Sequence, residues 1–294
     1  MASRSSKSRM VFNVVNYLFL MLMAILCVLP LINVLATSLS SSSAATAGQV
    51  TFWPVEFTLK SYEFMLNKPE FLRSVWITVQ RVVLGTVVSM GLTLLIAFPL
   101  SKTSSRFRFR TLYVWLFVFT ILFNGGLVPW YLTIRNLGLL DSIWALVLPG
   151  AVPVFNVILL INFFRGLPRE LDEAALIDGA GHWGTLWRIY VPLSLPAMAT
   201  LVLLTVVGHW NSWFDGLILM NSPTNYPLST YLQTVIVSQN LTTLTADQMK
   251  DLAELSNRTV QSAQIFLAAL PILLLYPFLQ KYFVKGLTLG AVKG

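Results

Sequence analysis

The chain has 294 residues, of which 56% are hydrophobic and 11% are charged, and its mean hydropathy is +0.71. Soluble domains carry about 25% charged residues, so there is too little polar surface here to cover water-soluble domains of this length. Intrinsic disorder is excluded as well, because disordered chains are poor in apolar residues. The composition therefore predicts an integral membrane protein.

The net charge of +8 comes from 20 lysines and arginines against 12 aspartates and glutamates. In a soluble protein this excess would indicate a nucleic-acid partner. In a membrane protein it is typical of the basic residues in short loops that fix the topology, and we expect this explanation and no nucleic acid. The single cysteine, Cys27, lies in an apolar run, where one thiol forms neither an internal disulfide nor a metal cluster.

Six apolar windows follow one another along the chain, each at least as long as the roughly 20 residues that a helix needs to cross the hydrocarbon core. They cover about residues 11–36, 75–100, 111–134, 143–163, 193–220 and 259–280. Because the runs are continuous rather than alternating, they predict helices and not the strands of a barrel. The expected fold is all-α, a single membrane domain over residues 1–294 with six transmembrane helices.

The first window has features of a signal peptide, since basic residues precede it and the small-residue stretch 40–47 follows it. A signal peptide's apolar region is only about 7–15 residues long, however, and the window 11–36 is far longer. We therefore expect a first span that is retained.

The lysines and arginines outside the windows predict the orientation. Thirteen of them lie in the N-terminal tail, in the C-terminal tail and in the connections between windows 2 and 3 and between windows 4 and 5. Six lie in the connections on the other side of the membrane. Since cytoplasmic loops carry the excess of basic residues, both termini are expected in the cytoplasm. Two long segments, 37–74 and 221–258, then face outward, and the sequence leaves open whether they meet a partner or only space the spans.

The cytoplasmic connection between windows 4 and 5 is longer than a simple connector needs, and its residues predict a helix–turn–helix over 168–190. Pro168 suits the first turn of a helix, and the acidic residues after it stabilise the positive end of the helix dipole. Asp178-Gly179 is expected to end this helix, because glycine tolerates a left-handed turn. A second short helix is expected to stop before Pro192. Small side chains here would let another backbone approach closely, which favours a docking element over a solvated connector.

This connection also carries a recognisable pattern. It consists of Glu173, Ala174, Ala175, Asp178, Gly179 and Ala180, followed by Trp187, Ile189, Pro192, Leu193 and Pro196. The pattern resembles the EAA motif of ATP-binding-cassette importer permeases, although phenylalanine is common where Trp187 stands. The resemblance covers nearly the whole chain and is strongest to the maltose-type second permease subunit, in a branch that serves oligosaccharides and uronate polymers such as alginate. Further matches to that branch lie at residues 124–129, 137–141, 208–214 and 290–294.

The resemblance implies an importer whose work is divided among subunits. The EAA loop of the family is a coupling helix that sits in a groove of a cytoplasmic ATPase subunit. The residues that it implies for coupling are Glu173, Ala174, Ala175, Asp178, Gly179 and Ala180. The implied partners are a second permease subunit, two ATPase subunits, an extracytoplasmic solute-binding protein, a sugar oligomer as substrate and the lipid of a bacterial cytoplasmic (inner) membrane. No cofactor is implied on this chain, because ATP and Mg²⁺ would bind the ATPase subunits.

The sequence holds no motif for catalysis of its own. It lacks the Walker A pattern, the H-E-x-x-H pattern, paired-cysteine metal spacing and the G-x-S-x-G nucleophile turn. An intramembrane enzyme would have only His209 and Asp215 to use, and on one helix these would point in different directions. The chain is therefore expected not to be an enzyme and to hold no metal.

Window 5 contains the polar and aromatic run 209–215. A carboxylate inside a span usually faces a polar cavity or a partner, and Asn211 and Asp215, four residues apart, would share one helix face. Amides and carboxylates suit the hydroxyls of a sugar, and flat rings suit its C–H faces. The residues predicted to line a substrate pathway are Trp210, Asn211, Trp213 and Asp215, with Arg81 of window 2. The alternatives are that the run belongs to an aromatic belt and that Arg81 reaches the interface.

These observations predict a transmembrane permease subunit of an ATP-binding-cassette importer for oligo- or polysaccharides, which forms half of the translocation pathway. A permease for another solute, such as a peptide or an amino acid, and a scaffold without transport are the alternatives. The charge of the sugar also stays open, because Asp215 would repel an anionic uronate whereas Arg81 would attract it.

Overall fold

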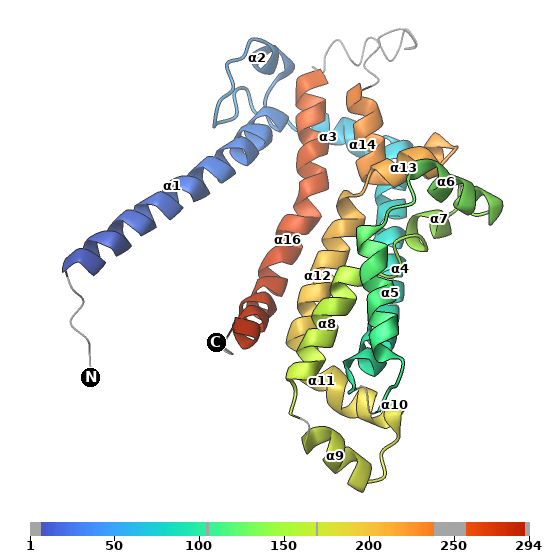
Figure 1. Cartoon of the computed structure of the whole chain (residues 1–294). Helices are drawn as coiled ribbons and strands as arrows, with labels where there is room; N and C mark the ends of the chain where they lie inside the picture. Colours follow the sequence, from blue (N-terminus) through green and yellow to red (C-terminus); the bar gives the residue numbers. More distant parts are fainter. Residues whose placement is uncertain (1–6, 104–105, 169, 238–256, 292–294) are drawn as a thin grey trace. The chain divides into compact units, whose positions relative to one another are not determined.

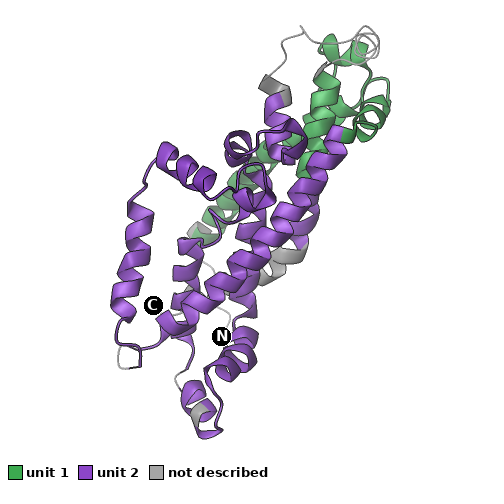
Figure 2. Cartoon of the chain, turned by 90° about the vertical axis from the view of Figure 1, so that its right-hand side faces the viewer, with its two compact units in different colours: residues 1–69, 235–270 green, residues 70–234, 271–294 purple. Residues whose placement is uncertain are grey.

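The computed structural model describes residues 7–103, 106–168, 170–237 and 257–291 (Figure 1). Every element in these ranges is a helix and none is a strand, which agrees with the all-α prediction. Much of the predicted outer segment 221–258 and the end of the 290–294 match lie outside the described residues. The chain divides into two compact units, Met1–Pro69 with Val235–Leu270 and Glu70–Thr234 with Pro271–Gly294, which Figure 2 shows in two colours.

Three long helices contain the first, second and sixth apolar windows. They are α1 (Lys7–Ser38), α4 (Pro69–Ser101) and α16 (Asn257–Ala291). Each includes a stretch that is long and apolar enough to cross a membrane. In α1 the side chains of residues 9–28 are all exposed, so this apolar surface has to meet lipid or another chain.

The third window is not one helix, contrary to the prediction. It divides into α5 (Arg110–Leu122) and α6 (Leu127–Asn136), which are bent by 114°. Between them Gly126 has a φ of +88°, and its N–H donates a hydrogen bond of 2.9 Å to Oδ1 of Asn124. The Asn-Gly-Gly sequence thus forms a turn, because glycine reaches backbone angles that other residues avoid, and hydropathy does not register such a turn.

The fourth and fifth windows are broken as well, and the prediction of continuous helices is wrong there too. The fourth consists of α7 (Ile143–Val147) and α8 (Val154–Gly166). Pro149, Gly150 and Pro153 lie between these helices and interrupt them, because proline lacks the N–H that a continuing helix needs. The fifth consists of α12 (Leu195–Asn211) and α13 (Phe214–Leu219). The backbone is extended at Ser212, where ψ is 120°, and this ends α12.

The connection before α12 is helical, and it ends later than predicted. After α9 (Glu170–Ile177) come α10 (His182–Thr185), a π-helical segment (Leu186–Tyr190) and α11 (Val191–Leu193). The prediction that this second helix stops before Pro192 is therefore wrong. A π turn is wider than an α turn, and here it ends two residues before Pro192, whose ring would clash with the carbonyl four residues earlier in a regular α-helix. A bend of 80° then separates α11 from α12.

The first unit contains, besides α1, the short helices α2 (Ser42–Thr46) and α3 (Lys60–Leu66). Ser41 caps α2, since its Oγ accepts a hydrogen bond of 3.2 Å from the N–H of Ala44. The hydroxyls of Ser38 and Tyr62 lie 2.7 Å apart, which ties the end of α1 to α3.

One face of α4 is buried and is largely small or polar. The small or polar residues of this face recur every three or four positions and are Ser74, Thr78, Arg81, Gly85, Ser89 and Thr93. This spacing places them on a single stripe of the helix. Oγ1 of Thr78 accepts a hydrogen bond of 2.7 Å from the N–H of Leu228, the first residue of α14 (Leu228–Val237). The stripe therefore faces protein and not lipid.

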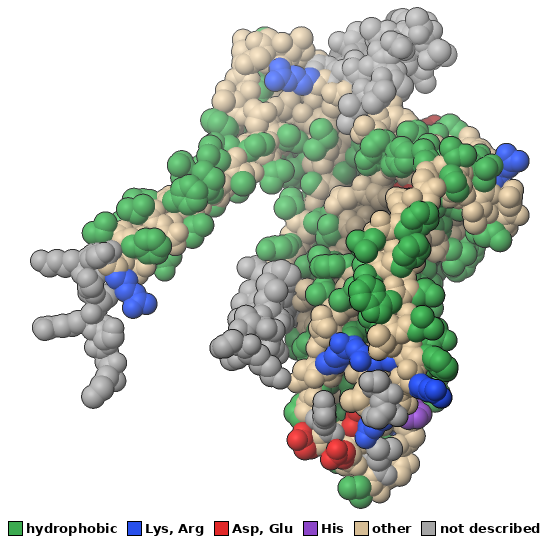
Figure 3. All heavy atoms as spheres, viewed as in Figure 1, with side chains coloured by type: hydrophobic (Ala, Val, Ile, Leu, Met, Phe, Trp, Pro, Cys, Tyr) green, Lys and Arg blue, Asp and Glu red, His purple; other side chains and the backbone are tan. Residues whose placement is uncertain are grey.

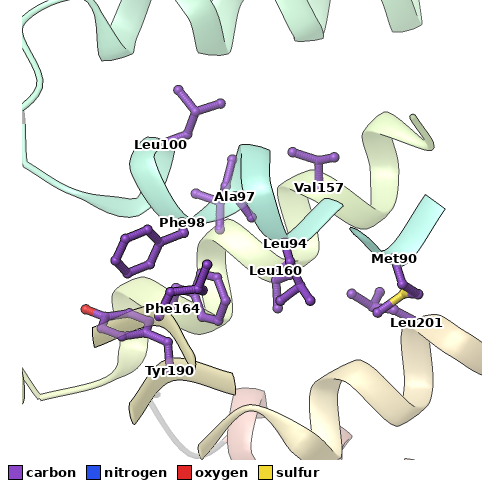
Figure 4. Close-up of a cluster of buried hydrophobic side chains, with 12 residues drawn as sticks. Met90, Leu94, Ala97, Phe98, Leu100, Val157, Leu160, Phe164, Tyr190 and Leu201 are labelled. Carbon is purple, nitrogen blue, oxygen red and sulfur yellow. The ribbon is translucent and has the colours of Figure 1, made fainter. Parts of the chain in front are cut away.

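The apolar core of the second unit lies where α4, α8, α12 and the π-helical segment meet (Figure 4). Tyr190 packs edge-on against two rings, with centroid distances of 5.1 Å to Phe98 and 5.1 Å to Phe164. Such edge-to-face pairs stabilise a core by about 0.5–1.5 kcal/mol beyond their buried area. The core thus joins the end of α4 to the segment that leads into α12.

Asp141, the last residue of the 137–141 match, organises the end of this unit that carries α6, α7 and α13. Its φ is +60°, and its Oδ1 accepts hydrogen bonds from the backbone N–H of Asn221 at 3.2 Å and from Nδ2 of Asn225 at 3.1 Å. Aspartate tolerates the left-handed region better than most residues, so this residue both turns the chain and holds the loop that follows α13.

Candidate functional site

A cavity of about 730 Å³ lies in the second unit between α4, α6, α7, α8, α12 and α13. Its polar lining residues are Arg81, Ser89, Asn124, Asn156, Thr205, His209, Ser212 and Asp215. Trp130 and Phe214 contribute aromatic rings. A mostly apolar cavity with a few convergent polar groups is the usual form of a small-ligand site.

An ion pair between Arg81 and Asp215 forms one wall of this cavity. Nη1 of Arg81 donates to Oδ1 of Asp215 at 3.2 Å and to the carbonyl of Ser212 at 3.1 Å, and Nη2 contacts Oδ2 of Asp215. Only 3% of the arginine side chain and 20% of the aspartate side chain are exposed. Oδ1 of Asp215 also accepts hydrogen bonds from Oγ of Ser212 at 2.8 Å and from the N–H of Gly216 at 2.9 Å. The two charges therefore compensate each other, and the alternative in which Arg81 reaches the interface does not hold.

Two further polar atoms of the lining have no hydrogen-bond partner within the structure. They are Nε of Arg81 and Oγ of Ser89, and both are buried. A buried polar group without a partner costs about 1–3 kcal/mol. Neither atom is accessible from the cavity, so a ligand there would reach them only if the cavity wall rearranged.

The predicted pathway residues are only partly brought together. Arg81 and Asp215 line the cavity, whereas Trp210, Asn211 and Trp213 are not among its lining residues. Trp210 is buried, and Asn211 is exposed at the end of α12. The helix ends at Asn211, so Asn211 and Asp215 do not share a helix face and that interpretation is wrong.

Sequence reasoning missed most of the cavity's polar lining. Nδ2 of Asn156 donates a hydrogen bond of 3.1 Å to Oγ1 of Thr205, which joins α8 to α12. The break at Ser212 also brings His209 and Asp215 to the same cavity, although both were expected to point apart on one helix. The three-to-four-residue spacing of polar residues in α4 is the signal that would have indicated an inward face.

Gly85 allows α4 and α12 to approach closely at the cavity wall. A methyl group at this position would overlap Nε2 of His209 and lie 2.7 Å from its Cε1. We expect Gly85→Ala to push the imidazole into the cavity and to reduce transport. Gly91→Ala is the matched control, because a methyl group there meets nothing within 4 Å and alanine favours the helix by about 1 kcal/mol. Thermal unfolding and uptake measured side by side would show no difference between the two variants if this contact were unimportant.

The second candidate site is the helix–turn–helix of α9 and α10, which lies at the opposite end of this unit from α6, α7 and α13 (Figure 1). Gly179 sits in the turn with a φ of +72°, as the sequence predicted. Of the motif residues, Glu173, Ala174, Asp178 and Gly179 are exposed, Ala180 is half-buried and Ala175 is buried. One face of the helix thus packs inward and another is free for contact.

The free face combines charge with apolar surface. The side chains of Ile177, Trp183 and Trp187 are exposed by 86%, 65% and 52%. Figure 3 shows basic and acidic side chains gathered at the same end of the unit. Large apolar side chains rimmed by polar ones are typical of a surface that binds another protein.

Comparison with known proteins gives a consistent result. The sequence model of the family described as "Binding-protein-dependent transport system inner membrane component" matches residues 1–289. Protein LplC of Bacillus subtilis (strain 168) is 40% identical over 290 residues, which cover 99% of this chain and 97% of that protein. The polygalacturonan/rhamnogalacturonan transport system permease protein YtcP of the same organism is 37% identical over 289 residues, which cover 96% and 98%.

A solved structure is similar over almost the whole chain. It is described as a bacterial ABC transporter involved in the import of the acidic polysaccharide alginate, and one of its chains superposes with a TM-score of 0.87 at 33% sequence identity, covering 95% of this chain and 99% of that one. The resemblance to importer permeases that the sequence indicated is thereby confirmed.

Proposed function

Because the chain belongs to the family of binding-protein-dependent transport system inner membrane components, we propose that it is one of two permease subunits of an ATP-driven importer for oligo- or polysaccharides. It is a transport component of the bacterial inner membrane and not a catalytic subunit. The names of its relatives favour saccharides over peptides or amino acids, since they include permeases for polygalacturonan, rhamnogalacturonan and maltodextrin.

The proposed topology has six spans with both termini in the cytoplasm. The first, second and sixth are α1, α4 and α16. The third is α5 with α6, the fourth α7 with α8, and the fifth α12 with α13, each broken by the turns described above. Broken helices are tolerated in membranes where they line a cavity, and α6, α7, α12 and α13 all contribute to the lining of the 730 Å³ cavity.

The coupling role rests on one observation, the exposed face of α9 beside a fixed left-handed turn. In this proposal α9 and α10 dock on a separate cytoplasmic ATPase subunit, where ATP and Mg²⁺ bind. Glu173 and Asp178 offer charge for that contact, and Ile177 and Trp183 offer apolar area. Short helices joined by a fixed turn transmit a displacement to the spans, which then move between outward-open and inward-open states.

The substrate pathway is proposed to run along the cavity that Arg81 and Asp215 line. Amide, hydroxyl and carboxylate groups of the lining suit sugar hydroxyls, and the rings of Trp130 and Phe214 suit the apolar faces of pyranose units. An extracytoplasmic binding protein would deliver the sugar at the end of the unit that carries α6, α7 and α13. Trp210, Asn211 and Trp213 remain candidates only for contacts outside this cavity.

The substrate class is tested by competition in the assembled complex. We expect unlabelled oligogalacturonate and maltotriose, but not trialanine, to reduce uptake of labelled oligogalacturonate into proteoliposomes that contain the binding protein and ATP. Uptake of labelled trialanine without uptake of labelled oligogalacturonate would favour the peptide permease, and failure of ATPase subunits to co-purify with this chain would contradict the importer proposal altogether.

A further inference from the structure

The two neighbouring carboxylates of α9, Asp172 and Glu173, differ in their exposure to solvent. Glu173 is exposed, whereas the side chain of Asp172 is only 13% exposed. Neighbouring positions of a helix are separated by about 100°, so Asp172 shares the inward face with the buried Ala175 three residues later. The motif that resembles the EAA pattern does not include Asp172, and its role therefore needs a separate explanation.

Asp172 binds two cations from the connection between α4 and α5. Nζ of Lys102 lies 2.8 Å from both of its carboxylate oxygens, and Nη1 of Arg106 lies 3.2 Å from Oδ2. The lysine side chain is also only 13% exposed. A largely buried charge is stable only when it is paired, so this contact fixes α9 to the end of α4.

The same lysine joins the cluster to the segment that leads into α12. Nζ of Lys102 donates a hydrogen bond of 2.9 Å to the hydroxyl of Tyr190 and lies 4.0 Å from the centre of its ring. Burial lowers the pKa of Lys102, and Asp172 opposes this shift. Burial, and then Asp172, raise the pKa of the Tyr190 phenol. Tyr190 therefore stays neutral and donates or accepts hydrogen bonds inside the cluster at physiological pH.

We propose that Asp172 is a positioning residue for transport, which holds the coupling helix in a fixed orientation to both α4 and the π-helical segment before α12. The proposal rests on the proposed function, because it explains how a push on α9 reaches two spans at once. Tyr190 belongs to the core cluster of α4 and α8, so the ionic contact connects α9 to the apolar core of the unit. Glu173 stays exposed beside this contact, and Asp172 holds the helix in place.

The test replaces Asp172 by asparagine in the complete complex with the second permease subunit, the ATPase subunits and the binding protein. We expect the subunits to co-purify and ATP to be hydrolysed, while the amount of sugar transported per ATP hydrolysed falls about tenfold or more. Removing one partner of a buried ion pair costs enough free energy to change the equilibrium between two orientations of α9 by at least that factor. Arg108→Gln, an exposed basic residue of the same connection, is the control and should leave the ratio unchanged.

An exchange of charges separates positioning from general stability. In an Arg106→Gln background, Lys102→Asp and Asp172→Lys should each lower the ratio of transport to hydrolysis, and the two together should restore much of it. An unchanged ratio in Asp172→Asn, with a wild-type complex that couples normally, would overturn the positioning role alone. A wild-type chain that binds no ATPase subunit would instead overturn the proposed function on which it rests.

Discussion

Gly179→Val is expected to abolish sugar uptake while the ATPase subunits remain bound and still hydrolyse ATP. The φ of +72° at this position costs a residue with a Cβ atom about 1–2 kcal/mol, and a β-branched side chain fits it least well. A methyl group there would meet nothing within 4 Å, so the effect comes from the backbone of the turn and not from a clash. We expect the turn to relax and α9 to lose its fixed angle to α10.

Uptake of labelled oligogalacturonate and release of phosphate, measured in the same proteoliposomes, check this result. Gly181→Ala is the matched control, because it lies in the same turn with an ordinary φ of −71° and open space around it. Glu173→Lys should give the same separation of hydrolysis from uptake by reversing the exposed charge, with normal insertion into the membrane. Normal uptake by both Gly179→Val and Glu173→Lys would contradict the coupling role of this element.

Asp215→Asn is expected to destabilise the protein and to stop transport. The substitution removes the carboxylate from an arginine whose side chain is only 3% exposed, and breaking a buried ion pair by removing one partner costs about 3–5 kcal/mol. The carbonyl of Ser212 would remain as a partner for Nη1 of Arg81, but the positive charge would be uncompensated at the cavity wall. Thermal unfolding in nanodiscs and uptake in proteoliposomes measure the two effects.

A double variant shows whether the pair serves the fold or the pathway. Arg81→Met with Asp215→Leu should recover most of the thermal stability, because replacing both buried charges by apolar side chains is often neutral, but it should not recover uptake. Arg135→Gln, an exposed arginine of α6, is the control and should change neither quantity. Full uptake in the double variant would show that the pair is only structural.

The helix–turn–helix of α9 and α10 was the part of the site that sequence reasoning predicted best. Its acidic first turn, its left-handed glycine and its exposed charges depend on local backbone preferences, which neighbouring residues set. The inward position of Asp172 was not predicted, because its partner Lys102 is 70 residues away in the chain. The end of the second helix was also misplaced, because the π-helical segment accommodates Pro192.

The cavity that Arg81 and Asp215 line was predicted least well. The interpretation of window 5 assumed one continuous helix, and the break at Ser212 changes which side chains meet. Arg81 and Asp215 were each identified as unusual charges inside a span, but 134 residues separate them in the chain, and they were assigned opposite effects on the substrate instead of being paired. The lining residues Asn156 and Thr205 are ordinary in sequence and gain meaning only by facing each other.

Local features of the chain were enough to identify an all-helical membrane permease of the importer family, because the length and apolarity of the windows and the local motif depend only on residues close together in the chain. The positions of the helix breaks, the pairing of Arg81 with Asp215 and the contacts by which Asp172 ties α9 to two distant segments became visible only in the folded structure. Hydropathy sums over a window and carries no information on backbone turns or on which distant charges meet. Those features follow from packing, in which a buried charge or a small residue is stable only beside its specific partner.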